Sequence, residues 1–314
     1  MQGGFTLTTL LSQNLGTNMT SETEQVRIES VQCISPDGLH RMVYKDWGDI
    51  DNPNVLVCVH GVTRVSDDFD ALARELAPRF RVICPDVVGR GRSGWLRTAQ
   101  NYQIQQYVCD MVTLLARINV NANAGNLSFL GTSMGGIIGS VLASLPESPI
   151  RKLILNDIGP VLNSSALGRI GQYIGQPIRF ATIDEADQYI RSLSVPFGEH
   201  TEEQWQKLSR DVLCQDKEGM WTRNYDLKLA VSMQAITPDQ AQAMQAMMWA
   251  TYDAISCPTL VLRGAESDLL SSETAQQMTQ RGPKAKVVEF EKNGHAPTLV
   301  HADQIAVVKE FLLG

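Results

Sequence analysis

The feature that most constrains the fold is a series of short apolar runs that alternate with helical patterns. Six of these runs end in glycine: NVLVCVHG (54–61), RVICPDVVG (81–89), NLSFLG (126–131), RKLILNDIG (151–159), CPTLVLRG (257–264) and AKVVEFEKNG (285–294). Strands that alternate with helices are typical of a largely parallel sheet. Two earlier runs, VRIESVQCI and HRMVYKDWG, are close enough in sequence to form an antiparallel pair. We therefore predict an α/β fold.

The regular spacing of these runs is interrupted once, between the fourth and the fifth. Residues 160–256 show helical patterns without a clear strand, which predicts an inserted helical cap. The α/β core then consists of residues 26–159 and 257–314. Residues 1–25 are polar and are expected to form a loose N-terminal tail, with Met19 as a candidate start of the chain.

One stretch of the expected cap, PDQAQAMQAMMWATYDAI, places large apolar side chains at helical spacing. These are Met244, Met247, Met248 and Trp249. Such a stripe suits either a ligand pocket or a packed interface. Packing is the favoured interpretation, because adaptable apolar residues mostly fill cores.

Charge and cysteine usage exclude several classes of protein. The chain has 27 Lys and Arg against 34 Asp and Glu, a net charge of −7 and no basic run, so a nucleic-acid partner is not expected. The six cysteines are scattered without a CxxC pair, which is typical of reduced thiols in the cytoplasm. No apolar window approaches the roughly 20 residues of a membrane span, and the first residues lack the positive start of a secretory signal. The oligomeric state is not readable from the sequence.

The stretch FLGTSMGGIIG contains a candidate nucleophile. Gly131, Ser133 and Gly135 form a GxSxG pattern between an apolar strand and a helical pattern. A serine on such a sharp turn requires small residues two positions before and after it, so that strand and helix can pass closely. The turn also lies at a helix N-terminus, where backbone N–H groups stabilise negative charge. We therefore predict that Ser133 is a nucleophile rather than a packing residue.

A serine nucleophile requires a base, and a carboxylate that orients this base. Among the five histidines, His295 in NGHAP directly follows the last apolar run, where its loop can fold over the edge of the sheet. Two aspartates near strand ends compete for the orienting role, Asp157 in LNDIG and Asp268 in RGAESDLL. Asp268 is preferred, because its strand is next to the one before His295. Asp157 would then lie near the pocket floor or cap the start of the insertion.

An acyl-transfer site also needs two N–H donors for the oxygen that becomes negative in the tetrahedral intermediate. The first expected donor is the N–H of Met134, directly after the nucleophile. The second should come from HGVTR, with Val62 as the expected donor and Gly61 as the residue that lets the backbone bend. His60 of the same stretch is interpreted as a loop-shaping residue rather than a second base.

A competing motif is the stretch GRGRSG, which matches the GxGxxG pattern of dinucleotide-binding sites through Gly89, Gly91 and Gly94. The residues that follow, WLRTAQNY, do not begin an apolar helix at the third glycine, so a dinucleotide site is not expected. No stretch has metal-ligand spacing either. We therefore expect neither a cofactor nor a metal.

The motifs HGVTR, PDVVGRGRSG, GTSMGG, RGAESD and NGHAP, in this order, resemble those of the α/β-hydrolase fold family over residues 26–314. The resemblance implies a mostly parallel eight-stranded sheet whose second strand is antiparallel, with the cap over the active site. It implies Ser133 as nucleophile, His295 as base and Asp268 as acid, with N–H donors at Val62 and Met134. The GRGRSG loop would be structural, with Arg90 and Arg92 tying backbone and carboxylates together.

The implied chemistry is a two-step acyl transfer without a cofactor. An apolar cap and the lack of a basic cluster favour neutral esters with small to medium acyl chains, so a carboxylesterase is the first interpretation. Within the family, hydrolysis of a carbon–carbon bond in a ring-cleavage product, or of an enol-lactone, is the alternative, with Arg64 holding a substrate carboxylate. A non-catalytic ligand receptor on the same fold and a perhydrolase side activity are further alternatives. Serine in place of aspartate argues against epoxide opening and dehalogenation, and the single glycine of HGV argues against esters of bulky tertiary alcohols.

Overall fold

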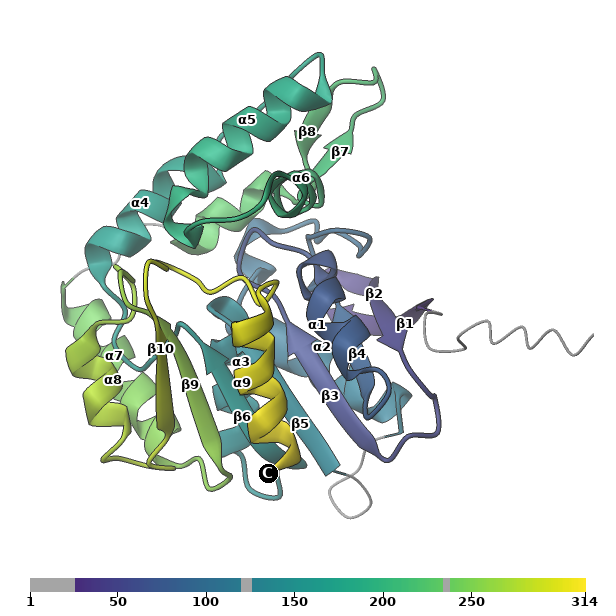
Figure 1. Cartoon of the computed structure of the whole chain (residues 1–314). Helices are drawn as coiled ribbons and strands as arrows, with labels where there is room; N and C mark the ends of the chain where they lie inside the picture. The colour runs from purple at the N-terminus through teal and green to yellow at the C-terminus, as the bar shows by residue number, and fades with distance from the viewer. Residues whose placement is uncertain (1–25, 120–125, 234–237) are drawn as a thin grey trace, which may run out of the picture.

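The computed structural model describes residues 26–119, 126–233 and 238–314 (Figure 1). The expected N-terminal tail and the candidate start at Met19 lie outside the described residues. Within the described part of the chain, no helix has the combination of length and apolar character needed to cross a membrane.

Eight strands form a single sheet in the order β1-β2-β4-β3-β5-β6-β9-β10. They are β1 Arg27–Ser35, β2 Gly38–Trp47, β3 Asn54–Val59, β4 Arg81–Pro85, β5 Asn126–Thr132, β6 Ile150–Asn156, β9 Thr259–Gly264 and β10 Lys286–Phe290. β2 pairs antiparallel with both β1 and β4, and the pairs from β4 to β10 are parallel. The predicted α/β fold with an antiparallel second strand is therefore confirmed.

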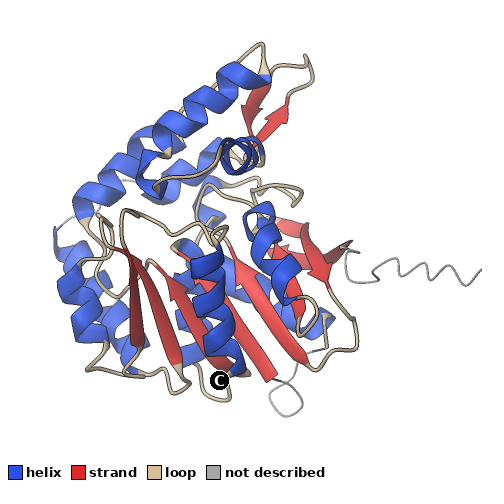
Figure 2. Ribbon diagram, in the orientation of Figure 1, coloured by secondary structure: helices blue, strands red, loops and turns tan. Residues whose placement is uncertain are grey.

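Helices cover both faces of the sheet (Figure 2). Alternation along the strands divides the buried side chains between two cores, because successive residues of a strand point to opposite faces. In β3, Val55, Val57 and Val59 belong to one core, and Leu56 and Cys58 to the other. The helices over the first core are α2 Ile104–Arg117, α3 Met134–Ser144 and α8 Ser272–Met278, and those over the second are α1 Asp70–Leu76 and α9 Ala302–Leu313.

An insertion after β6 rises above the carboxyl ends of the strands (Figure 1). Its elements are α4 Ser164–Ile174, α5 Ile183–Leu193, η4 Val195–Phe197, α6 Glu202–Arg210, the antiparallel pair β7 Leu213–Gln215 and β8 Trp221–Arg223, and η5 Leu227–Met233. The starts of two of these helices are encoded locally: Thr182 with Glu185 and Thr201 with Gln204 form capping boxes. The two remaining short helices, η2 Ser66–Phe69 and η3 Ala99–Asn101, belong to the core.

The helix α7, Pro238–Asp253, differs from the expected domain boundary. It lies beside α8 and packs against α3 of the core, although we expected it within a cap that reached residue 256 (Figure 1). Trp249 is 8% exposed and Tyr252 1%, and both belong to the core that also contains α3. Met247 is exposed, and none of the three methionines lines the cavity described below. Of the four stripe residues, only Trp249 is buried in the core, so the expected packing holds for this residue and not for Met247. Periodicity alone did not show that the helix packs against the core rather than within the cap.

Candidate active site

Ser133 occupies the sharp turn between β5 and α3, with a φ of 52° and a ψ of −114°. A positive φ is strained for a residue with a side chain, and such strain is typical of functional positions. A Cβ atom at Gly131 would lie 2.2 Å from the backbone of Gly135, and one at Gly135 would lie 2.0 Å from the Val59 carbonyl oxygen. The two glycines of the GxSxG pattern are thus required by close backbone contact.

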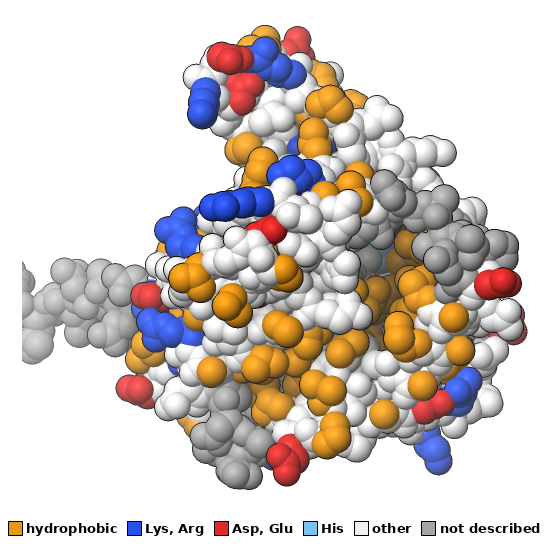
Figure 3. All heavy atoms as spheres, turned by 180° about the vertical axis from the view of Figure 1, so that it is seen from behind, with side chains coloured by type: hydrophobic (Ala, Val, Ile, Leu, Met, Phe, Trp, Pro, Cys, Tyr) orange, Lys and Arg blue, Asp and Glu red, His pale blue; other side chains and the backbone are white. Residues whose placement is uncertain are grey.

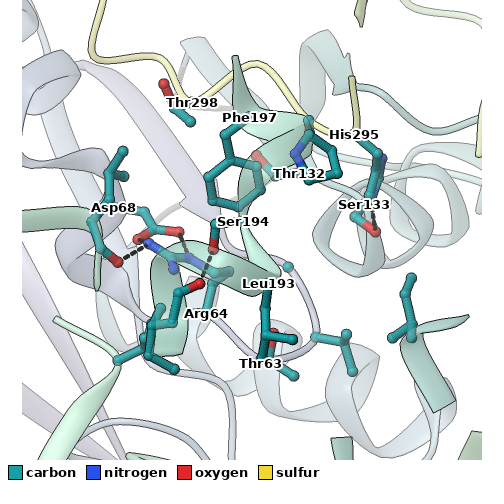
Figure 4. A pocket seen from close by; sticks show the side chains of 18 of the residues that line it. Thr63, Arg64, Asp68, Thr132, Ser133, Leu193, Ser194, Phe197, His295 and Thr298 are labelled. Carbon is teal, nitrogen blue, oxygen red and sulfur yellow. Dashed lines mark hydrogen bonds and ion pairs between the residues drawn. The ribbon is translucent and has the colours of Figure 1, made fainter. Parts of the chain in front are cut away.

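His295 lies in the loop after β10, and its side chain is only 11% exposed. Its Nε2 atom is 3.0 Å from the Ser133 Oγ atom, and its Nδ1 atom is 2.7 Å from an oxygen of Asp157 (Figure 4 shows the serine and the histidine). A histidine that contacts a serine with one ring nitrogen and a carboxylate with the other has the geometry required to take a proton from the hydroxyl.

Asp157 directly follows β6 and is fully buried. Its Oδ1 atom accepts a hydrogen bond of 3.0 Å from the Gly264 N–H, and its Oδ2 atom accepts one of 2.6 Å from the Ser267 hydroxyl. These donors hold the carboxylate in one orientation toward His295. Ser267 was not expected from the sequence, because its role depends on a contact with a strand end far away in the chain.

Asp268 does not contact His295, so the expected pairing is wrong. Its side chain is 45% exposed and accepts hydrogen bonds of 3.1 and 2.7 Å from the Arg169 guanidinium of α4. The reason is positional: Asp157 is the first residue after its strand, whereas Asp268 lies several residues beyond the end of β9 at Gly264. Because β6 lies between β5 and β9, its carboxyl end is next to the serine turn.

Asn156, the last residue of β6, joins the loops of the site. Its amide group donates to the Thr132 hydroxyl at 3.0 Å and to the Pro297 carbonyl at 2.8 Å, and its backbone carbonyl accepts the Ser133 N–H at 3.0 Å. It therefore connects the serine turn with the histidine loop. Its position beside Asp157 in LNDIG was the only sequence signal for this role.

The HGVTR loop lies next to the serine turn. A Cβ atom at Gly61 would be 3.8 Å from the Ser133 Cβ atom. The loop is held by Arg90, which is 1% exposed and donates from Nε to the Val62 carbonyl at 2.9 Å. Met134 is the first residue of α3, so its N–H has no carbonyl one turn earlier to bond. Both expected oxyanion donors thus lie on backbone that flanks the nucleophile.

His60 is fully buried behind this loop. The Val87 N–H donates to its Nε2 atom at 3.0 Å, so its Nδ1–H donates to the Gly61 carbonyl at 2.7 Å. Burial lowers its pKa to about 4, which keeps the ring neutral. Both ring nitrogens are used in shaping the loop, as the sequence indicated.

The GRGRSG loop has the structural role that the resemblance implied. Arg90 also donates to the Val88 carbonyl at 2.7 Å, while Arg92 pairs with Asp67 at 2.6 Å and with Asp86 at 3.5 Å. A Cβ atom at Gly91 would lie 2.4 Å from the Asp86 carboxylate, so this glycine makes room for a side chain of the same protein.

Three potential metal ligands meet away from the site, although their sequence spacing gave no sign of it. Among the described residues, Cys33, His40 and Asp110 form such a group, and all three are buried. His40 Nε2 is 3.0 Å from an Asp110 oxygen. Burial, with the charge of Asp110, raises the pKa of the Cys33 thiol to about 12, which disfavours the thiolate that binds metals.

A cavity above Ser133 is lined by both the core and the insertion (Figure 4). The core contributes the HGVTR loop, Ser133 and His295. The insertion contributes apolar residues such as Phe197 and Leu208, together with Tyr173, Arg223 and Tyr225. Arg64 forms a bidentate pair with Asp68, at 2.8 and 2.6 Å, and its guanidinium lies 5.5 Å from the Phe197 ring centroid.

On the face in Figure 3, apolar side chains are spread over the core, and charges of both signs gather at the outer end of the insertion.

The known proteins that this chain resembles are hydrolases and lipases. The sequence model of the alpha/beta hydrolase family matches residues 56–308. The 3-hydroxybutyrate-oligomer hydrolase of Cupriavidus necator is 50% identical over 291 residues, which cover 92% of this chain and 98% of that protein. Lipase 1 of Psychrobacter immobilis is 25% identical over 90% of this chain and 82% of that protein. The crystal structure of an alpha/beta hydrolase from Novosphingobium aromaticivorans is similar, with a TM-score of 0.80 and 34% identity over 92% of this chain and 99% of that chain.

Proposed function

The chain belongs to the alpha/beta hydrolase family and is a hydrolase of ester bonds, and from that premise we propose that it cleaves linear oligomers of 3-hydroxybutyrate. The likeness to the Cupriavidus necator enzyme, which extends over nearly the full length of both proteins, supports this substrate. A 3-hydroxybutyryl unit is also a short acyl group, in agreement with the small to medium acyl chains expected from the sequence. We propose the cytoplasm as its location, because all six cysteines are free thiols.

The observation that carries the proposed mechanism is the 3.0 Å contact between Ser133 Oγ and His295 Nε2. Ser133 attacks the ester carbonyl while His295 takes the hydroxyl proton, and the imidazolium then protonates the leaving alcohol. The product of this step is an acyl-enzyme. His295 next activates a water molecule, which releases the acid and restores the serine.

Asp157 acts in this mechanism by accepting the Nδ1–H of His295 and stabilising the imidazolium. The N–H groups of Val62 and Met134 stabilise the oxyanion of the tetrahedral intermediate. Residues 160–233 act as a cap that closes the cavity above the serine and limits the size of the substrate.

The carbon–carbon and enol-lactone alternatives named Arg64 as a residue that could hold a substrate carboxylate. Its guanidinium is instead bound to Asp68 and to the Leu208 carbonyl at 2.8 Å, so Arg64 gives these alternatives no support. The perhydrolase side activity stays a prediction of the same site.

The test is release of 3-hydroxybutyrate from the linear dimer and trimer by wild type and by Ser133→Ala, with p-nitrophenyl esters of rising acyl length as a second substrate series. We expect turnover of the oligomers and of short-chain esters, with a loss of about 10⁵-fold or more in the variant. Turnover of the short-chain esters without turnover of the dimer or trimer would refute the proposed substrate, and equal rates in both proteins would refute the nucleophile.

A further inference from the structure

The cavity wall contains a buried arginine that has no acidic partner among the described residues. Arg223, the last residue of β8, lines the cavity and is 4% exposed. Its hydrogen bonds are donated to neutral groups, from Nε to the Gln176 carbonyl at 3.0 Å and from Nη2 to the Tyr189 hydroxyl at 3.3 Å. A buried positive charge without a counter-ion is unfavourable unless a ligand supplies the negative charge.

The other two arginines that line the cavity differ from Arg223 in this respect. Arg64 is paired with Asp68 at 2.6 Å, and Arg169 with Asp268 at 2.7 Å. Each of these positive charges is thus already balanced within the protein. Arg223 contributes a net positive charge to the wall.

Aromatic rings surround the Arg223 guanidinium. It lies 5.9, 5.6 and 5.5 Å from the ring centroids of Tyr173, Tyr189 and Tyr225. Cation–π contacts of this kind stabilise and orient the guanidinium, but they do not neutralise its charge. The arrangement therefore holds a cation in one place while leaving it available to an anion.

Tyr225 provides a second observation that points to a ligand. It lines the same cavity and is 3% exposed, and apart from the neighbouring Arg223 guanidinium its hydroxyl has no hydrogen-bond partner in the described ranges of the chain. Burial raises its pKa well above the ordinary value, so the hydroxyl stays protonated and can donate. Burial also raises the pKa of Tyr173 in the same wall, against the charges of Arg169, Arg223 and Arg64.

We propose that Arg223 and Tyr225 form a carboxylate-binding subsite in the cap side of the cavity. The identity of its ligand rests on the proposed function: a linear 3-hydroxybutyrate oligomer has one free carboxylate, at one end. Arg223 and Ser133 line the same cavity, so in this proposal the carboxylate binds at Arg223 while the ester bond nearest to it is attacked by Ser133. The leaving group then carries the carboxylate, so the enzyme shortens oligomers from their carboxyl end.

Binding measurements on a protein without the nucleophile test the carboxylate subsite independently of ester hydrolysis. Isothermal titration of the Ser133→Ala protein with the linear 3-hydroxybutyrate dimer, as the free acid and as its methyl ester, compares a charged ligand with a neutral one. We expect the acid to bind more tightly, and Arg223→Gln in the same background to weaken its binding by about 10- to 100-fold, the range for hydrogen bonds to charged groups. Binding of the methyl ester should change less than about threefold.

Three further variants control for structure. Tyr225→Phe removes only the Tyr225 hydroxyl, so it should weaken binding of the acid by about threefold or more without lowering the Tm. Arg223→Lys keeps the positive charge but loses the planar set of guanidinium donors, so it should bind the acid more tightly than Arg223→Gln and more weakly than the protein with Arg223. Arg179→Gln removes a cap arginine that pairs with Asp216 and Glu218 outside the cavity, and should leave both affinities unchanged.

Equal binding of the acid and the methyl ester, no binding of either, or an equal loss of both in Arg223→Gln would overturn the subsite. In the last case Arg223 serves only to hold the cap together. These results differ from a failure of the proposed function, which would be seen as wild type releasing no 3-hydroxybutyrate from the dimer. Selective binding of the acid without its hydrolysis would support the subsite and refute the proposed substrate.

Discussion

At the scale of single residues, the site depends on groups whose partners are supplied by distant parts of the chain. Ser133, His295 and Asp157 come from three different strand ends, yet their contacts are 3.0 and 2.7 Å long. Asp157 and Asp268 are the same residue type near neighbouring strand ends. They differ in environment, since one carboxylate is buried against a histidine and the other is exposed beside an arginine.

Asp157→Asn and Asp268→Asn test this distinction directly. Loss of the Asp157 carboxylate removes the group that orients His295 and stabilises its charged form, so kcat should fall by about 10³- to 10⁴-fold. Asp268→Asn removes only a half-exposed ion pair, and kcat should stay within about threefold of wild type. Initial rates on a p-nitrophenyl ester measure both effects. A large loss in Asp268→Asn together with an active Asp157→Asn would restore the original assignment.

At the scale of elements, the serine turn is built by close contact between β3, β5 and α3. The two glycines that flank Ser133 let the helix start directly over the strands, and this contact keeps the nucleophile at the N-terminus of α3. The capping boxes of α5 and α6 show the opposite case, in which a helix start is determined by neighbours in sequence. The turn should therefore be sensitive to added volume.

Gly135→Ala should distort this turn, because the new Cβ would lie 2.0 Å from the Val59 carbonyl oxygen. We expect a loss of several kcal/mol in the free energy of unfolding, or failure to fold, and a loss of activity in any folded protein. Gly168→Ala in α4 is the matched control, since nothing lies within 4 Å of its Cβ position. It should be neutral or stabilising by about 0.5–1 kcal/mol. Denaturant unfolding measures the free energy of unfolding of both variants. Similar changes in the two would contradict the explanation that close backbone contact at Gly135 requires a glycine.

At the scale of the whole molecule, the active site lies between a sheet-based core and an insertion whose placement depends on contacts between them. Arg169 with Asp268, Lys207 with Asp70 and the Tyr102 hydroxyl with Asp226 connect the two parts. The Tyr102–Asp226 bond, 2.8 Å long, is buried, whereas the Arg169–Asp268 pair is exposed. The buried contact should therefore contribute more to holding the insertion over the cavity.

Tyr102→Phe leaves the buried Asp226 carboxylate without one of its donors. We expect the free energy of unfolding to fall by about 1–3 kcal/mol, because the unsatisfied acceptor keeps its desolvation penalty. Limited proteolysis should cut the insertion faster than in wild type. The exposed Arg169–Asp268 pair, measured by a double-mutant cycle, should contribute less than about 1 kcal/mol. A larger contribution from the exposed pair than from Tyr102 would contradict this ranking.

The local sequence determined the eight strands of the main sheet, the serine turn and the histidine loop, and the family resemblance supplied the antiparallel second strand. These features depend on periodicity, on glycine at a sharp turn and on motif order, all of which are short-range properties. The short strands β7 and β8 lie in the insertion, where no strand was expected. Only the tertiary structure decided that Asp157 rather than Asp268 faces His295, that α7 packs on the core, and that Arg223 is buried without an acidic partner. Each of these features depends on which distant segments of the chain become neighbours on folding. The residues next to it in sequence do not determine those contacts.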